Sequence, residues 1–213
     1  MDFSIVDKCI TLIAKRKSGK SYLLRWLVKQ HQTFYDKIFC ICPTEKINKF
    51  YQNDNFIDPK CIYESYDESF VKQLIDKMTK SVEKGEKRKI LLILDDCVAD
   101  TRFHDSPTLK QLFVRGRHLN ISVIITSQYM KSIPPIARSN SDFILLGQLN
   151  QQGLEICSDE FTSAGLTKKE FAKLYRESTM DFNFLIINND STKYGTINET
   201  YGTLKTPASE FPK

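Results

Sequence analysis

The chain has 213 residues, 41% hydrophobic and 27% charged, which is an ordinary composition for one folded domain with a substantial core. Apolar runs fall short of the roughly 18–20 residues that span a bilayer, and the start Met-Asp-Phe-Ser lacks the basic segment of a secretory signal. A formal net charge of +5 is compatible with a polyanionic partner without requiring one. We therefore expect a single cytosolic domain over residues 1–213.

The first informative segment is a loop that reads AKRKSGKS, between an apolar run from Cys9 to Ile13 and an amphipathic run from Tyr22 to His31. This order predicts a strand, a phosphate-binding loop and a helix, as in the G-x-x-x-x-G-K-[ST] motif. Loop amides would surround a β-phosphate, Lys20 would add a positive charge, and the Ser21 hydroxyl would bind Mg²⁺. The predicted nucleotide-binding residues are Ala14, Lys15, Arg16, Lys17, Ser18, Gly19, Lys20 and Ser21.

Two acidic residues follow a later apolar run. Lys89 to Leu94 reads KILLIL and is typical of a buried parallel strand, and it delivers Asp95 and Asp96 to one edge of the sheet. In a P-loop NTPase the first acid holds Mg²⁺, directly or through water, and the second can polarise the attacking water. The alternative is a core strand that ends in a helix-capping acid. Upstream, Glu68–Val82 has the spacing of an amphipathic helix that ends at Gly85.

A further helix is predicted to begin at Ser106-Pro107 and to end at Gly116. It places Arg115 and Arg117 at a helix end, pointing away from the chain's own nucleotide site. This position suits an arginine that acts on the nucleotide of a neighbouring subunit. Two solvated surface arginines are the alternative.

The next β-branched run, Asn120 to Thr126, ends in Ser127 and Gln128. An amide at the tip of a strand beside the phosphate-binding loop could sense a γ-phosphate or orient water, and Gln128 is therefore a candidate catalytic residue. The alternative is a loop glutamine that is hydrogen-bonded to the backbone.

Apolar runs alternate with helical patterns along the chain, which indicates an α/β fold with a mostly parallel sheet. Thr167 and Glu170 form a capping box at the start of a late helix, and the tail at 194–213 would form a sheet edge or fray. The six cysteines lack the paired spacing of a zinc site and are expected to be reduced and packed as small apolar groups. The strand-like runs are Lys8–Ile13, Lys37–Cys42, Lys89–Leu94, Ile121–Thr126, Phe143–Leu146 and Phe182–Ile187.

These motifs occur in a recognisable order: the phosphate-binding loop, CPTE at 42–45, LILDD, GRHLNISVIITSQ and IPPIARSNSD. In this order the chain resembles the genome-packaging ATPases of large double-stranded DNA viruses, the poxvirus-type branch of the FtsK–HerA superfamily. The likeness covers about Ile10 to Gln148. It implies a P-loop fold of the additional-strand type, in which the strand before Gln128 lies between the other two functional strands and helices cover both faces.

The resemblance also implies roles for residues. Lys20 and Ser21 would bind phosphate and Mg²⁺, and Asp95 would complete the metal site. The expected catalytic residues are Asp96 for the attacking water, Gln128 as sensor and Arg117 as the trans-acting arginine. Arg115 is an alternative to Arg117, and Arg138 is either the trans-acting arginine or a second sensor. The implied activity is ATP hydrolysis coupled to translocation of double-stranded DNA into a preformed capsid. The implied partners are a homo-oligomeric ring and capsid or portal-vertex proteins, at an assembly site in the host cytoplasm or on the virion.

Two positions depart from the family pattern. Ala14 replaces the first glycine of the loop, which predicts a slightly reshaped loop. Asp96 stands where many relatives carry Glu, and its shorter side chain would shift the bound water. Two other classes stay open: another P-loop enzyme, such as a nucleotide kinase or a different DNA pump, and a module in which nucleotide binding without hydrolysis licenses assembly on DNA or capsid.

Overall fold

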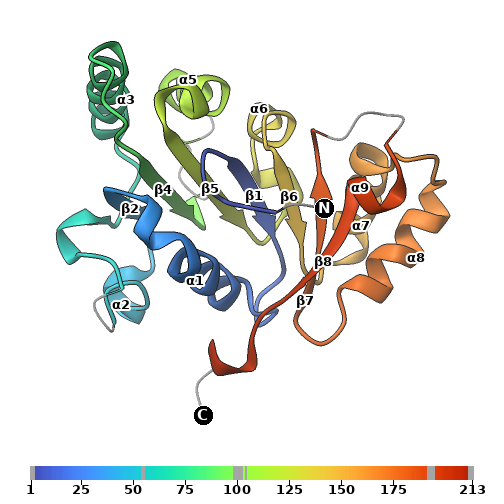
Figure 1. Cartoon of the computed structure of the whole chain (residues 1–213). Helices are drawn as coiled ribbons and strands as arrows, with labels where there is room; N and C mark the ends of the chain where they lie inside the picture. The colour runs from blue at the N-terminus through green and yellow to red at the C-terminus, as the bar shows by residue number, and fades with distance from the viewer. Residues whose placement is uncertain (1–2, 54–55, 98–102, 104, 191–194, 211–213) are drawn as a thin grey trace.

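The computed structural model describes residues 3–53, 56–97, 103, 105–190 and 195–210. In this part of the chain, eight strands form one sheet in the order β3-β2-β4-β5-β1-β6-β7-β8 (Figure 1). The strands are β1 Cys9–Ile13, β2 Lys37–Ile41, β3 Ile62–Tyr63, β4 Ile90–Asp95, β5 Ile121–Ser127, β6 Phe143–Leu146, β7 Asn183–Asn188 and β8 Tyr201–Lys205.

The pairings from β3 through to β6 are parallel, and β7 and β8 are added antiparallel. Strand β5 lies between β1 and β4, as the resemblance implied, so the fold is the additional-strand type of P-loop NTPase. Strands β1, β4, β5 and β6 are buried along their whole length because helices cover both faces. The parallel strands therefore place all their carboxyl ends at one edge and their amino ends at the opposite edge. The first is here called the catalytic edge, because the predicted phosphate-binding loop, Asp96 and Gln128 follow strand ends there.

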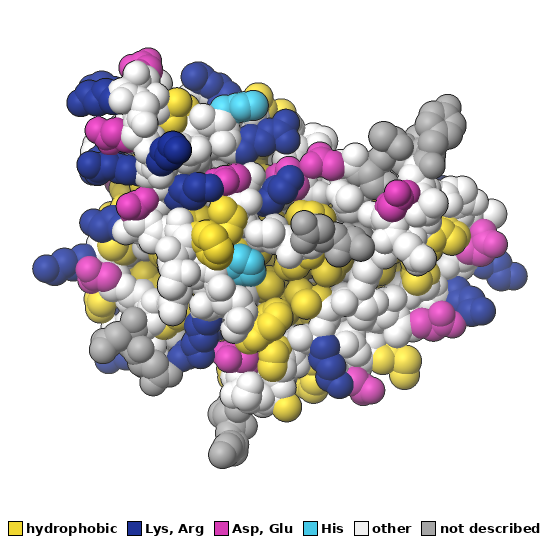
Figure 2. All heavy atoms as spheres, viewed as in Figure 1, with side chains coloured by type: hydrophobic (Ala, Val, Ile, Leu, Met, Phe, Trp, Pro, Cys, Tyr) yellow, Lys and Arg dark blue, Asp and Glu magenta, His cyan; other side chains and the backbone are white. Residues whose placement is uncertain are grey.

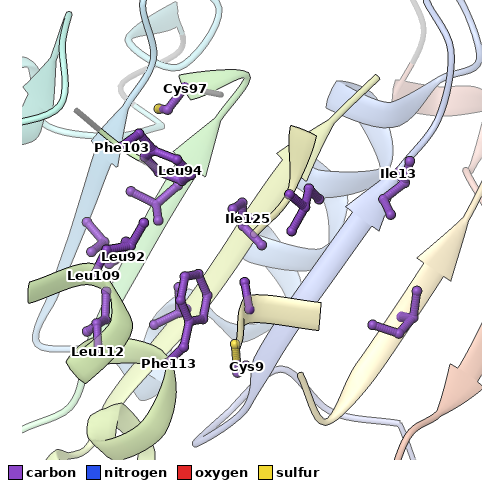
Figure 3. Close-up of a cluster of buried hydrophobic side chains, with 14 of the residues drawn as sticks. Cys9, Ile13, Leu92, Leu94, Cys97, Phe103, Leu109, Leu112, Phe113 and Ile125 are labelled. Carbon is purple, nitrogen blue, oxygen red and sulfur yellow. The ribbon is translucent and has the colours of Figure 1, made fainter. Parts of the chain in front are cut away.

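The helices of the described residues are α1 Lys20–His31, α2 Glu45–Asn48, α3 Glu68–Glu83, α5 Pro107–Arg115, α6 Pro135–Ser139, α7 Gln151–Phe161, α8 Lys168–Ser178 and α9 Ile197–Thr200. Alternate residues of each strand pack on opposite faces of the sheet. Along β4, Leu92 and Leu94 pack in a cluster with α3 and α5, whereas Leu91 and Ile93 pack in a second cluster with α1. Figure 3 shows the first cluster, in which Leu109 and Leu112 of α5 lie against Leu92.

Local sequence signals explain where the helices begin. The Asp67 side chain accepts from two amides at the start of α3, and Ser106 Oγ accepts from Leu109 N at the start of α5. Thr167 and Glu170 form the predicted capping box of α8. Helix α5 ends at Arg115 as predicted, but Gly116 has a φ of −53° and the chain continues as a 3-10 helix, Gly116–Leu119. Gly116 permits a close approach instead, since a Cβ there would lie 3.2 Å from Ile121 O.

The tail was expected to form an edge or to fray, and residues Tyr201–Lys205 form the edge strand β8 on β7. The two-residue strand β3 was not predicted, because two residues are too few to show a period. Within the described ranges, no helix combines the length and the apolar character that crossing a bilayer requires.

Candidate active site

The loop between β1 and α1 is anchored to the ends of two neighbouring strands. Ala14 N donates to Ser127 O at 3.1 Å and Lys15 N donates to Gln148 O at 2.8 Å. Lys17 and Gly19 have φ of 63° and 84°, in the left-handed region, and they curl the loop back before Lys20 begins α1. The first amides of a helix have no intrahelical acceptors, so the loop directs N–H groups and a positive helix end toward one point. This arrangement suits a phosphate group.

Ala14 fits its position without backbone strain. It is fully buried, and it is not among the described residues with positive φ. Its Cβ has space because residue 147, on the adjacent strand end, is glycine. A Cβ on Gly147 would lie 2.7 Å from the Ala14 Cβ and 2.6 Å from the Phe184 ring. The missing glycine at position 14 is thus compensated by a glycine at position 147, which the sequence pattern did not reveal.

Lys20 is held at the centre of the candidate site. Its ammonium lies 2.7 Å from Asp96 Oδ1 and 3.3 Å from Thr126 Oγ1, and its side chain is only 8% exposed. Asp96 comes directly after β4, with a φ of 51° that turns its side chain back toward the loop. The structure therefore brings together the P-loop lysine and the second acid of the Asp-Asp pair.

Asp95 is buried and hydrogen-bonded on both oxygens. Oδ1 accepts from Thr126 Oγ1, and Oδ2 accepts from Tyr51 OH at 2.8 Å and from Cys42 Sγ at 3.6 Å. Burial, and then the charge of Asp95, raises the pKa of Tyr51, so its hydroxyl remains a proton donor. The carboxylate is therefore rigidly oriented.

Thr126 and Tyr51 are site residues that sequence reasoning missed. Thr126 is directly opposite Asp95 in the β4–β5 register, so a correct strand alignment could have found it. Tyr51 comes from the segment after α2, 44 residues before Asp95, and carries no motif that could have indicated it.

Gln128 extends the network across the site. Its amide nitrogen donates to Asp96 Oδ2 at 3.2 Å, and its amide oxygen accepts from Arg16 Nε at 3.1 Å. These groups border a cavity of about 200 Å³ in which four cationic side chains face one carboxylate, so the cavity favours an anion. Its lining is Lys15, Arg16, Lys17, Gly19, Lys20, Ser21, Tyr22, Asp96 and Gln128.

The three candidate arginines lie elsewhere. Arg115 and Arg117 are exposed at the amino end of β5, and Arg117 Nη1 is 3.6 Å from Asp142 Oδ1. A strand rises about 3.3 Å per residue, so the seven residues of β5 put these arginines far from their own chain's site. Arg138 is mostly buried and makes two hydrogen bonds to Glu160, at 2.8 and 2.7 Å.

The strand order, the anchored loop and the carboxylates after β4 define a P-loop NTPase of the additional-strand type. The chain belongs to the Poxvirus A32 protein family, which it matches over residues 5–195. The resemblance seen in the motifs is thereby confirmed. Protein 075L of Invertebrate iridescent virus 6 is 29% identical over 189 residues, which cover 87% of this chain and 72% of the relative.

Two solved structures share the fold. The genome packaging NTPase B204 of Sulfolobus turreted icosahedral virus 2, in complex with sulfate, has a TM-score of 0.67 at 17% identity, over 96% of this chain and 98% of that one. The pCW3 conjugation coupling protein TcpA has a TM-score of 0.65 at 16% identity, over 93% of this chain and 60% of that one. At these identities the likeness is one of fold.

Proposed function

We propose that this chain hydrolyses ATP and uses the energy to move double-stranded DNA into a preformed viral capsid. The observation that carries the proposal is the placement of Asp96 between Lys20 and Gln128, at 2.7 and 3.2 Å. It joins a phosphate-binding cation, a candidate base and a candidate water-positioning amide at one sheet edge. Membership of the Poxvirus A32 protein family and the fold shared with a genome packaging NTPase support the same function.

Nucleotide binding is supported by the four cations of the cavity and by the curled loop. The protein B204 was solved with AMPPCP and with ATP-gammaS. In this chain Lys20 would hold the β- and γ-phosphate oxygens. The Lys20 ammonium is already hydrogen-bonded to the Asp96 carboxylate, so a bound phosphate would compete with Asp96 for the same positive charge.

The donors near the loop fit Mg²⁺, which prefers oxygen ligands. Ser21 lines the cavity and offers a hydroxyl, and Asp95 offers a carboxylate whose orientation is set by Thr126 and Tyr51. Because Asp95 is only 6% exposed and bonded on both oxygens, it suits a water-mediated contact. Bound Mg²⁺ would neutralise phosphate charge.

Hydrolysis requires a water molecule in line with the γ-phosphorus. Asp96 accepts the proton of this water, and Gln128 holds the water in place through its amide. Once phosphate has taken over Lys20, the Oδ1 atom of Asp96 is available for that proton. The Gln128 bond fixes the other carboxylate oxygen, so the base is oriented before the water arrives.

The trans-acting arginine limits how subunits could assemble. Arg117 lies at the edge opposite its own site, so it reaches a nucleotide only if a neighbour presents its catalytic edge to this edge. Such a head-to-tail contact generates rings when the rotation closes. Arg115 shares the location, whereas Arg138 would first have to leave Glu160. An arginine supplied in trans can contribute roughly 10³–10⁵ in rate.

DNA as the moved substrate is supported by charge. Figure 2 shows many Lys and Arg side chains, with a smaller number of Asp and Glu side chains among them, over the surface where α3 and α5 lie. Phosphate neutralisation by such side chains is independent of DNA sequence, as a packaging motor needs. Capsid or portal-vertex proteins would be the further partners, and the site of action would be the host cytoplasm where virions assemble.

Steady-state phosphate release from ATP tests the proposal, with protein concentration varied and double-stranded DNA present or absent. A ring with shared sites gives DNA-stimulated turnover that rises faster than linearly with protein, and Arg117→Ala abolishes the stimulated rate while ATP still binds. Lys20→Ala defines the background. Turnover that is linear in protein and indifferent to DNA would identify a self-contained enzyme. Turnover at the Lys20→Ala level under every condition would identify a module that binds nucleotide without hydrolysing it.

A further inference from the structure

A second cavity lies on the other side of the phosphate-binding loop. It has a volume of about 190 Å³ and is separate from the cavity that contains Asp96 and Gln128. Three parts of the chain form it: the tip of the loop, Gln148 two residues after β6, and the connection from α8 to β7. Its lining is Lys17, Ser18, Gln148, Thr179, Asp181, Phe182 and Asn183.

The strand order tells which end of a nucleotide would point there. Asp96 follows β4, Gln128 follows β5, the phosphate-binding loop follows β1, Gln148 follows β6, and Asn183 begins β7. In the sheet these strands are consecutive, β4-β5-β1-β6-β7. A triphosphate whose γ-end faces Asp96 therefore directs its other end across the loop toward β6 and β7. Lys17 borders both cavities, so they meet at the loop.

The connection from α8 to β7 is conformationally unusual. Asp181 and Phe182 are consecutive residues in the left-handed region, with φ of 50° and 61°. A bulky residue there is rare and costs energy, and such strain is found where a side chain must be presented in one direction. The turn is held by two backbone bonds, Asn183 N to Met180 O at 2.9 Å and Thr206 N to Phe182 O at 3.2 Å. The result is a phenylalanine, 46% exposed as a residue, that borders the cavity.

The remaining lining is polar in a way that suits a heteroaromatic ring. Asn183 Nδ2 donates to Met180 O at 2.6 Å, which leaves its amide oxygen as an acceptor. Thr179 Oγ1 donates to Tyr175 O at 2.9 Å, which leaves its lone pairs as acceptors. Gln148 is exposed and carries both a donor and an acceptor. An aromatic face beside amide groups is the combination that binds nucleobases by stacking and edge contacts.

We propose that this cavity, bounded by Phe182, Gln148 and Asn183, receives the purine base of the bound nucleotide. The base stacks on the Phe182 ring, and its polar edge meets the two amides. This inference rests on the nucleotide binding proposed above and adds a second recognition element to it. The phosphate-binding loop holds the charge of the ligand, and the strained turn before β7 recognises the base.

Calorimetric titration with ATP and with inorganic tripolyphosphate separates the two elements, because tripolyphosphate has no base. Phe182→Ala should weaken ATP binding roughly 5- to 150-fold, the range that alanine substitution of a base-stacking residue produces. It should leave tripolyphosphate binding unchanged. Met180→Ala is the matched control, since Met180 is 60% exposed in the same turn but does not line the cavity. It should leave both affinities unchanged.

Phe182→Asn provides a second test, because asparagine tolerates the left-handed conformation and removes the ring. Phe182→Tyr keeps the ring and should retain ATP affinity. Equal ATP affinity in the wild type and in Phe182→Asn would overturn the proposal, and so would parallel losses of ATP and tripolyphosphate binding. Failure of the nucleotide site itself would look different: Lys20→Ala would then bind both ligands as well as the wild type does.

Discussion

The two edges of the sheet carry similar numbers of charges but arrange them differently. At the catalytic edge, four cationic side chains face the single carboxylate of Asp96 around a cavity of about 200 Å³. At the opposite edge, α3 and the starts of β2 and β4 enclose a larger cavity of about 510 Å³, with an apolar floor that includes Phe39, Leu74 and Met78. Four lysines, one arginine and two carboxylates surround this floor. Size alone would select the wrong edge.

The two edges differ in their ion pairs and in the direction of the helices that border the cavities. At the opposite edge, several cations meet carboxylates of their own chain: Lys89 with Asp7, and Lys8 and Arg117 with Asp142. Cations outnumber carboxylates around both cavities, but at the catalytic edge they surround the start of α1, whereas at the opposite edge they surround the end of α3. A helix start attracts an anion and a helix end does not. The polarity of the parallel strands produces this contrast, since loops after strand ends present free helix starts and loops before them do not.

Asp96→Asn should show the largest effect on the catalytic edge. Asparagine keeps the side-chain shape and tolerates the φ of 51°, so the backbone stays in place. Loss of the base should lower turnover by roughly 10²–10⁴. ATP should bind more tightly, because a negative charge is gone and Lys20 no longer has a competing partner.

Single-turnover phosphate release and calorimetric titration measure these two effects separately. Asp76→Asn removes an exposed carboxylate from α3 and should change neither. Wild-type turnover in Asp96→Asn would assign the base to another group.

Thr126→Val should destabilise the same edge through Asp95. The substitution removes a donor to the Asp95 carboxylate and a contact with Lys20, while the β-branched shape of the side chain is kept. Leaving a buried polar group without a partner costs about 1–3 kcal/mol, and more for a charged one. Urea unfolding measures the loss. Thr11→Val is the comparison: Thr11 is also buried, but its hydroxyl is hydrogen-bonded to the neutral hydroxyl of Ser141, at 2.7 Å. A smaller loss of stability in Thr11→Val than in Thr126→Val would assign the difference to the Asp95 carboxylate.

Much of the fold could be predicted because strands buried on both faces are continuous apolar runs. All six predicted runs form strands, and their ends differ from the structure by one residue at most. The antiparallel direction of β7 could not be predicted, because a short apolar run has the same pattern in a parallel and in an antiparallel strand. In the site, Lys20, Asp96 and Gln128 were predictable as ends of strands and loops. Tyr51 was not, because a hydroxyl that reaches a carboxylate from a distant segment has no local signature.

Gly147→Ala tests the compensation for the missing loop glycine. The added methyl group would meet the Phe184 ring and the Ala14 Cβ, both under 3 Å away. Overpacking of this kind costs about 1–3 kcal/mol. Ala14→Gly in the same chain should recover part of the lost stability, because it removes the contact with the Ala14 Cβ. The contact with the Phe184 ring would remain and account for the rest of the loss. Thermal unfolding of the two single variants and the double variant gives the coupling energy. Additive effects would show that the two positions do not share space.

The smallest expected effect compares two exposed lysines, one at each edge. Lys15→Ala removes a cation beside the candidate phosphate site. An exposed charge at about 4 Å contributes on the order of 1 kcal/mol. The dissociation constant for ATP should therefore rise about 5-fold. Lys84→Ala removes the same charge beside the larger cavity. The distance from Lys84 to the candidate phosphate site is about a strand length, beyond the screening length of about 8 Å at physiological salt, so Lys84→Ala should leave ATP affinity unchanged there.

Both variants keep the fold, since neither side chain is buried. ATP titration at low and at physiological salt then decides the comparison. A Lys84→Ala effect equal to that of Lys15→Ala at physiological salt would mean that net charge, rather than the polarity of the sheet, attracts the nucleotide.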